Sequence, residues 1–391
     1  MIHFSDDSNN AKADNIYEII NSFRDVAEKP YEYACQLKAD KNISVVGNLC
    51  NYIPEEIIVA AGCLPFRIFG ESKNTMHSDA LIQSYCCSVV KSVLEDAMDN
   101  KLSFLNGMVF PHVCDSIQRL SDIWRLNIKD GCHFDVLFPV KIGGHSSKKY
   151  MIAVLGKFKS DIENILKVKI DYRSLKSAIT LLNNIRKNMM HLYELKALYP
   201  GIIKGSDLNA VVKGSMVMYR EDVDILLNKL VKLLNERINI IIIEKSCEKR
   251  ILISGSICSQ PAIYDIIEDQ NACVVGDDLC TGLRNFDFLI DENIEPIEAI
   301  AEKFLKRLIC PAKYIDNSSR SEYIKNMVKT YSVDGVIFVF LKFCDPFFFD
   351  YPYLKTELDS NNISSILVEI SSMKQIDEQI RTRIETFLQI L

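Results

Sequence analysis

Short apolar runs alternate with amphipathic segments along most of the chain, and this alternation most constrains its fold. Runs such as "ISVVGNLC" (43–50) and "FLNGMVFP" (104–111) have the length and β-branched content of buried strands. Segments with apolar residues at helical spacing follow them, as in "CDSIQRLSDIWRL" (114–126). Parallel strands need crossover connections, which are usually helices. The alternation therefore predicts an α/β fold with mostly parallel sheets covered by helices.

The pattern divides the chain into four parts. Residues 1–40 are predicted to form an N-terminal helical segment, and 41–157 an N-terminal α/β lobe. Residues 158–248 have helical spacing almost throughout and are predicted to form a helical section. The alternation resumes in 249–391, which is predicted to form a C-terminal α/β lobe. The expected architecture is two doubly wound, flavodoxin-like parallel-sheet lobes with the helical section between them.

Composition and charge narrow the possible partners. The 391 residues are 48% hydrophobic and 25% charged, with a net charge of −6 and no dense block of Lys or Arg. These values argue against a basic face for nucleic acid or membrane. No apolar run reaches the roughly 20 residues that a membrane-spanning helix needs. The polar start "MIHFSDDSNNAKADN" is not typical of a signal peptide, so a cytoplasmic protein is expected.

Thirteen cysteines are many for a chain expected in a reducing compartment. There they should not form disulfides, so the set is expected to include metal ligands or catalytic thiols. The chain contains no CxxC pair, which argues against a structural zinc site. Free cysteines are also often simply buried, and most of the thirteen are interpreted in that way.

Some cysteines lie where predicted strands and helices meet. In "VIFVFLKFCDP" (336–346), Cys344 lies where the predicted strand gives way to a loop. Cys114 follows the strand at 104–111, and Cys86 and Cys87 lie in the helix before that strand. Open parallel sheets bind ligands at the carboxyl ends of their strands, so these thiols converge if the two lobes face each other.

Convergent thiols of this kind suit an iron–sulfur cluster, since no His accompanies them. The helix N-termini near Cys87 and Cys114 are also expected to favour the thiolate that binds metal. The separations of 27 (87 to 114) and 230 (114 to 344) match no local metal motif. From spacing alone, scattered core thiols remain the alternative.

Six stretches, in order from about residue 40 to the C-terminus, resemble one family: "NLCNYIPEEIIVAAGCLPFRIFG", "QSYCCSVVKS", "FLNGMVFPHVCDSIQRLSDIW", "ISGSICSQPAIYDIIE", "VDGVIFVFLKFCDPFFFDYPYLK" and "EQIRTRIETFLQIL". Together they are similar to the 2-hydroxyacyl-CoA dehydratase and benzoyl-CoA reductase family. The chain resembles the iron–sulfur subunit of the dehydratase D-component.

The resemblance implies a 4Fe-4S cluster held by three cysteines, which leaves one iron open to substrate. The blocks "SYCC", "HVCD" and "KFCDP" carry these ligands over to Cys87, Cys114 and Cys344. Cys86 is the alternative ligand to Cys87. Cys87 is preferred because it lies two positions after the tyrosine, as the family's cysteine does.

The chemistry implied by the resemblance is that of an oxygen-sensitive radical enzyme. An ATP-dependent activator protein would supply one electron, which reduces the thioester carbonyl of a 2-hydroxyacyl-CoA to a ketyl radical anion that expels the hydroxyl group. The implied partners are the acyl-CoA substrate, the activator and a homologous second subunit in a heterodimer.

Two other functions stay open. "HSDALIQSYCCS" resembles benzoyl-CoA reductase subunits, which reduce an aromatic acyl-CoA. A subunit that only relays electrons to a catalytic partner is the other alternative.

Glu56 is the candidate for proton transfer, because "YIPEE" resembles the family's Pro-x-Glu block. A carboxyl group buried near a cluster is expected to have a raised pKa, as acid–base catalysis requires. The alternative is that Glu55 and Glu56 only stabilise the first turn of a helix.

The C-terminal lobe leaves room for other sites. Cys258, Cys280 and Cys310 lie in or near its turns and are candidates for a second cluster. Some relatives carry a double-cubane cluster on extra cysteines, but the sequence does not place six ligands. Gly255 and Ser256 form a strand-to-helix turn that either holds a CoA phosphate or is only structural.

Overall fold

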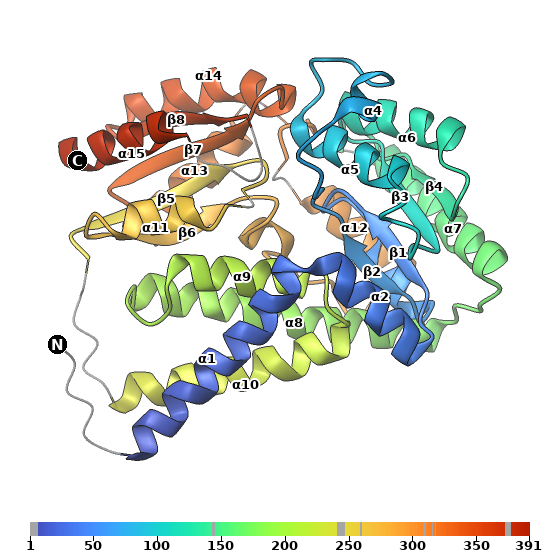
Figure 1. Cartoon of the computed structure of the whole chain (residues 1–391), viewed down its shortest axis with the longest axis horizontal. Coiled ribbons are helices and arrows are strands. Elements are labelled where there is room, and N and C mark those ends of the chain that lie inside the picture. Colours follow the sequence, from blue (N-terminus) through green and yellow to red (C-terminus); the bar gives the residue numbers. More distant parts are fainter. Residues whose placement is uncertain are drawn as a thin grey trace.

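Two parallel four-stranded sheets organise the computed structural model, which describes residues 7–142, 145–240, 247–258, 260–307, 310–314, 316, 318–371 and 377–391 (Figure 1). Helices flank both sheets, so the predicted α/β fold with two flavodoxin-like lobes is confirmed. In the described part of the chain, no helix is long and apolar enough to span a membrane.

The N-terminal sheet has the strand order β2-β1-β3-β4. Its strands are β1 (Val45–Asn48), β2 (Leu64–Arg67), β3 (Gly107–Pro111) and β4 (Cys132–Val136). The first three strands are buried throughout, as expected for a parallel sheet covered on both faces. The strand order reverses between β1 and β3, which pair with Val46 opposite Gly107. This switch point is where a doubly wound sheet binds its ligand.

The C-terminal sheet repeats this arrangement with the order β6-β5-β7-β8. Its strands are β5 (Lys249–Gly255), β6 (Ala272–Asp278), β7 (Gly335–Leu341) and β8 (Ser364–Ile370). Its switch point lies between β5 and β7, where Gly255 pairs with Val339. Strand β7 ends at Leu341, three residues earlier than the sequence pattern predicts.

Helices cover the two sheets and form a layer beneath them (Figure 1). The helices around the N-terminal sheet are α2 (Pro30–Lys41), α3 (Glu55–Ala60), α4 (Met76–Asp79), α5 (Ser88–Met98), α6 (Asp115–Asn127) and α7 (His145–Leu166). The C-terminal lobe contributes α11 (Ala262–Glu268), the 3₁₀ turn η1 (Leu283–Asn285), α12 (Pro296–Lys306), α13 (Ser319–Thr330), α14 (Asp345–Ser360) and α15 (Glu378–Ile390).

The helical section contains α8 (Tyr172–Leu198), α9 (Gly205–Ser215) and α10 (Arg220–Ile240), while residues 241–246 lie outside the described residues. Helix α1 (Asp7–Glu28) packs mainly against α9 and α10 of the helical section. The helical segment predicted for 1–40 is therefore divided, because α1 joins the helical layer. Helix α2 packs near the first sheet, where Tyr31 contacts Phe66 and Phe104.

Helix α12 does not follow the predicted division of the chain. The sequence analysis assigned no helix here, although Pro296 opens it and Ile300 and Phe304 are buried. The helix packs against α7 of the N-terminal lobe. After α12, Tyr314 donates its backbone N–H to the carbonyl of Val140. A segment of the C-terminal half thus returns to the first lobe.

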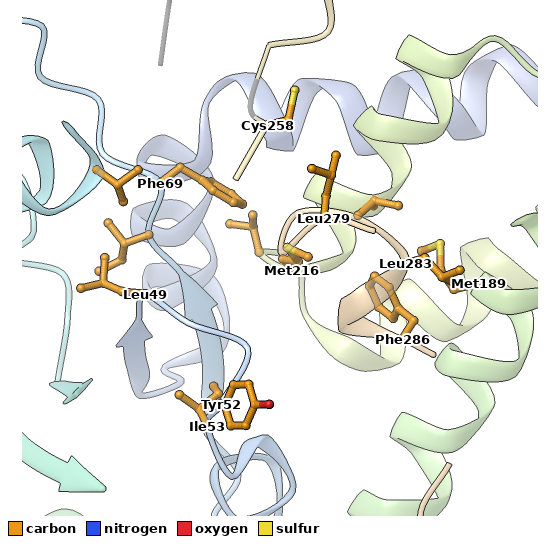
Figure 2. Close-up of a cluster of buried hydrophobic side chains, with 14 of the residues drawn as sticks. Leu49, Tyr52, Ile53, Phe69, Met189, Met216, Cys258, Leu279, Leu283 and Phe286 are labelled. Carbon is orange, nitrogen blue, oxygen red and sulfur yellow. The ribbon is translucent and has the colours of Figure 1, made fainter. Parts of the chain in front are cut away.

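The two lobes and the helical section share one hydrophobic core. Figure 2 shows its centre, where side chains of the first lobe, the helical section and the second lobe meet: Leu49, Tyr52, Ile53, Phe69, Met189, Met216, Cys258, Leu279, Leu283 and Phe286. Because every part buries apolar surface against the others, the facing of the two sheets is fixed by packing.

We predict that Gly255→Ala destabilises the protein at the second switch point. A Cβ atom there would lie 1.9 Å from the backbone oxygen of Val339, which belongs to the neighbouring strand. Such overpacking typically costs about 1–3 kcal/mol of unfolding free energy. Urea denaturation measures the change.

Gly156→Ala is the matched control, because nothing lies within 4 Å of the added methyl group in helix α7. This variant should be more stable than the parent by roughly 0.5–1 kcal/mol. Equal stability of the Gly255 variant and the parent would contradict the close approach of β5 and β7.

Candidate functional site

The structure brings Cys87, Cys114 and Cys344 to one cavity between the two lobes. All three line a cavity of about 520 Å³, here called the thiol cavity. Cys87 is the N-cap residue of α5, Cys114 of α6 and Cys344 of α14. Cys86, the rival to Cys87, is buried and lines a neighbouring cavity instead. The geometry therefore favours Cys87 as the member of this set.

The local fold explains these positions. Cys114 and Cys344 follow β3 and β7, so both lie at the carboxyl edge of a switch-point strand. Pro346 lies in the first turn of α14 and stops the extended chain just after Cys344. Phe343 adopts a left-handed backbone conformation with φ of 65°. That conformation is unusual for a bulky residue and often occurs at ligand sites.

A second set of thiols, Cys50, Cys280 and Cys310, lies next to the first. The three thiols are electrostatic neighbours of one another, and Cys50 and Cys310 are also neighbours of Cys114. They follow β1, β6 and α12, respectively. Asn51 fixes their relative position, because its side-chain amide donates to the Cys280 carbonyl at 2.9 Å.

The sequence analysis predicted Cys258, Cys280 and Cys310 as candidates for a second cluster. The fully buried Cys258 thiol is directed to the Gln260 carbonyl, although the Cys258 backbone is hydrogen-bonded to Thr281, next to Cys280. Cys50 takes its place beside Cys280 and Cys310. The sequence offered one signal for Cys50, which is its position two residues after β1 at the first switch point.

The spacing of these thiols does not suit a single metal ion. In the described part of the chain, the only group of three donors within 4.8 Å of one another is His77, Glu95 and Asp99. Three thiolates on one zinc would lie closer than this limit, since each Zn–S bond is about 2.3 Å. An iron–sulfur cluster holds its thiolates farther apart, because each binds a different iron.

Buried cations lie beside four of the six thiols, which are Cys50, Cys114, Cys280 and Cys310. Arg67, Arg284, Arg307 and Lys313 are all more than nine-tenths buried. Asp278 pairs with Arg284, but the ion pairs of the described residues include no partner for the other three cations. The Nε atoms of Arg67 and Arg307 are buried without a hydrogen-bond partner among the described residues.

These cations lie close enough to the thiols to interact with them electrostatically. Cys50 and Cys280 lie beside Arg67, and Cys50, Cys114 and Cys310 lie beside Lys313. The Arg284 guanidinium also donates to the Cys280 Sγ at 3.3 Å. Burying an uncompensated charge is costly. An anionic group held by thiolates would balance this charge, so the residues present fit an iron–sulfur cluster.

Burial controls the acidity of the thiols. It raises the pKa of Cys87, Cys114 and Cys344, and it raises the pKa of Cys310 to about 12. The backbone N–H groups at the helix N-termini favour the thiolates of Cys87 and Cys114, as expected, but the loss of solvation outweighs them in the thiols alone. Metal binding would replace the proton.

Glu56 lies outside the thiol cavity and is fully buried. It joins α3 to two other helices, since its carboxylate contacts Lys303 of α12 at 2.8 Å and Arg186 of α8 at 2.5 Å. Burial opposes ionisation, but the two cations lower the pKa of Glu56 to about 2. The expected raised pKa is thus wrong, and proton transfer by Glu56 stays a prediction.

Taken together, the fold and the site define a two-lobed α/β protein with a thiol centre between facing switch points. Residues 50–391 match the family model described as 2-hydroxyglutaryl-CoA dehydratase, D-component. The chain belongs to this family. Membership confirms the resemblance drawn from the sequence and the expectation of an enzyme of the dehydratase or reductase type.

Curated relatives match nearly the whole chain. The (R)-phenyllactyl-CoA dehydratase beta subunit of Clostridium sporogenes is 28% identical over 96% of this chain and 100% of its own length. The lactoyl-CoA dehydratase subunit beta of Anaerotignum propionicum is 25% identical over 95% and 98%, respectively. A benzoyl-CoA reductase subunit of Thauera aromatica is 28% identical over 90% and 91%. Relatives of both enzyme types therefore match at similar identity.

We predict that Glu56→Gln destabilises the fold, because it leaves Lys303 and Arg186 buried without their carboxylate. The expected loss of unfolding free energy is about 3–5 kcal/mol. Replacing Lys303 by Met in the same chain should recover part of this loss. Glu322→Gln, which breaks a surface pair with Lys325, is the control and should change stability by less than about 1 kcal/mol.

The pH dependence of stability should distinguish the Glu56 variant from the parent. The folded pKa of Glu56 is about 2, below its ordinary value of 4.5. Its contribution is therefore fully present above about pH 4.5 and is lost as pH falls toward 2. Denaturation curves of parent and variant should converge in that range. A constant difference down to pH 2 would contradict the buried ion pair.

Proposed function

We propose that the chain is the iron–sulfur subunit of an oxygen-sensitive enzyme that eliminates water from a 2-hydroxyacyl-CoA. Cys87, Cys114 and Cys344 are the proposed ligands of a 4Fe-4S cluster with one open iron. The observation that carries the proposal is their convergence from three helix N-caps on one cavity between the switch points. Family membership supports it, because the relatives are named as dehydratase and reductase subunits.

A cluster bound here would supply a low-potential electron and a Lewis acid for a thioester carbonyl or hydroxyl oxygen. The chain's own residues would hold the substrate beside it. Phe349 and Tyr353 line the thiol cavity with exposed rings, which suits an apolar acyl group. Arg320 also lines the cavity, and its guanidinium is held in place by Asp278 and Asp350.

One proposed partner, a second subunit, follows from the same relatives. Two of them are named as beta subunits, so we propose a homologous second subunit for this chain. An ATP-dependent activator protein is proposed as the source of the electron. The thiol cavity opens between the two lobes, which gives a second protein access to the proposed cluster.

The second thiol set favours a second candidate function. Cys50, Cys280 and Cys310 lie among buried cations, of which Arg284 pairs with Asp278, whereas the ion pairs of the described residues include none for Arg67. Six thiolates would hold a double-cubane cluster, which carries more negative charge for Arg67, Arg307 and Lys313 to balance. The chain would then belong to a reductase, and the similarity to the benzoyl-CoA reductase relative from Thauera aromatica agrees with that alternative.

Activity assays distinguish the two candidates. The chain, purified without oxygen together with its partner subunit, is mixed with activator, ATP and an electron donor. Loss of water from 2-hydroxyacyl-CoA substrates, measured by mass spectrometry, is the expected result. Reduction of aromatic acyl-CoA substrates instead would support the reductase, and activity on neither class would contradict both.

We predict that Cys114→Ser and Cys344→Ser each reduce iron content and abolish the cluster's electron paramagnetic resonance signal. The fold should persist, because both thiols lie at helix ends and line a cavity. Circular dichroism checks the fold. Cys35→Ser is the control, since Cys35 is exposed and does not line the cavity. Full iron content in both site variants would contradict the ligand assignment.

Cys310→Ser separates a three-thiolate cluster from a six-thiolate one. With three ligands, the variant should keep the parent's iron content, because Cys310 then binds no iron. With six ligands, it should lose roughly half of the iron, since one cubane loses a thiolate. Iron analysis of the anaerobic protein gives the answer, and Cys63→Ser, a buried thiol outside both sets, is its control.

A further inference from the structure

A second cavity lies beside the thiol cavity and differs from it in charge. It has a volume of about 230 Å³ and is lined by residues from both lobes, and we call it the lysine cavity. Three lysines line it: Lys73 after β2, Lys91 of α5 and Lys342 after β7. No Asp or Glu is among the described residues that line it. The lysine cavity is therefore a site of concentrated positive charge.

Hydroxyl groups complete its lining. Ser72, Thr75, Ser88, Ser92 and Ser371 surround the lysines. The Ser88 Oγ is buried and finds no hydrogen-bond partner among the described residues, although a buried hydroxyl normally has one. The hydroxyls of Ser72, Thr75 and Ser92 already donate to Asp96, Asp79 and the Ser72 carbonyl, respectively. The Ser88 hydroxyl and the ammonium groups are therefore the donors that the cavity offers to a phosphate.

The lysines differ in how far their charge is already balanced. Lys91 pairs with Asp79 at 2.8 Å. Within the described residues, the ion pairs include no partner for Lys73 or Lys342, and both side chains are exposed. Two positive charges in the cavity are thus available to a bound anion.

The thiol cavity differs from the lysine cavity because carboxylates also line it. Asp115, Asp316, Asp345 and Asp350 line it. Its lysine, Lys313, is buried, and its arginine, Arg320, is already paired with two carboxylates. Phosphate groups would be repelled by these carboxylates, so the thiol cavity suits only the uncharged end of an acyl-CoA.

One residue joins the two cavities. Phe343 lines both, and the adjacent Cys86 and Cys87 line the lysine and thiol cavities, respectively. Phe343 is the residue with the left-handed backbone conformation. A ligand that passes this ring can therefore place one end among the lysines and the other beside the proposed cluster.

We propose that the lysine cavity binds the phosphate groups of the acyl-CoA whose thioester lies in the thiol cavity. This inference rests on the proposed function, which supplies the acyl-CoA. Lys73 and Lys342 contact the phosphates, and Ser88 donates its hydroxyl hydrogen to a phosphate oxygen. Phe343 separates the phosphates from the reacting end.

Calorimetry with CoA tests the proposal on the anaerobic, iron-loaded protein. The double variant Lys73→Gln, Lys342→Gln should bind CoA about tenfold more weakly or worse, because charge-assisted hydrogen bonds to phosphate are lost. Pantetheine, which has no phosphate, should bind parent and variant equally. Lys232→Gln, an exposed lysine of α10 outside both cavities, is the matched control and should keep the parent's affinity.

Other outcomes overturn the proposal in different ways. Unchanged CoA affinity in the double variant would exclude the lysines as the phosphate site. Binding of pyrophosphate or ATP, but not of CoA, would assign the cavity to phosphates from another source. A parent protein that contains iron but binds neither CoA nor acyl-CoA would instead refute the acyl-CoA function itself. Iron content and the paramagnetic spectrum of each variant show that the cluster is intact.

Discussion

Buried positive charge around the thiols is the constraint on which the rest of this structure depends. Arg67, Arg307 and Lys313 lie in the interior beside Cys50, Cys114, Cys280 and Cys310, and two guanidinium Nε atoms there lack partners among the described residues. An isolated buried cation costs several kcal/mol. An anion beside these cations is therefore expected to stabilise the arrangement, and thiolates on a cluster would provide one. Folding and cofactor binding are linked in such a site.

The architecture explains why this centre forms between the lobes. Each sheet has its switch point at the strand pair that carries a site cysteine, and the shared core turns the two carboxyl edges toward one cavity. Helix α12 crosses back to the first lobe, and the buried Glu56 binds it there together with α8. Glu56 thus positions the parts of the chain that surround the thiols. Its deprotonated state makes it a structural anion of the fold.

The sequence predicted the fold well, because strand and helix spacing reflect local burial. From the strand and helix pattern, Cys86, Cys87, Cys114 and Cys344 were expected to converge only if the two lobes face each other, and the family resemblance selected Cys87, Cys114 and Cys344. The sequence analysis missed Cys50 and the surrounding cations because their proximity arises from contacts between distant segments, such as Arg307 with the backbone of Asn51. The raised pKa expected for Glu56 failed for the same reason. Lys303 and Arg186 are far away in sequence but adjacent in space.

The most direct test of this account is the iron and acid-labile sulfide content of the chain purified without oxygen, with a paramagnetic resonance spectrum after reduction. About four iron and four sulfide per chain are predicted for a cluster on Cys87, Cys114 and Cys344. About eight iron would extend the centre to the second thiol set. Parent protein prepared without oxygen that contains neither iron nor sulfide would contradict the account, because Cys87, Cys114 and Cys344 would then hold no cluster.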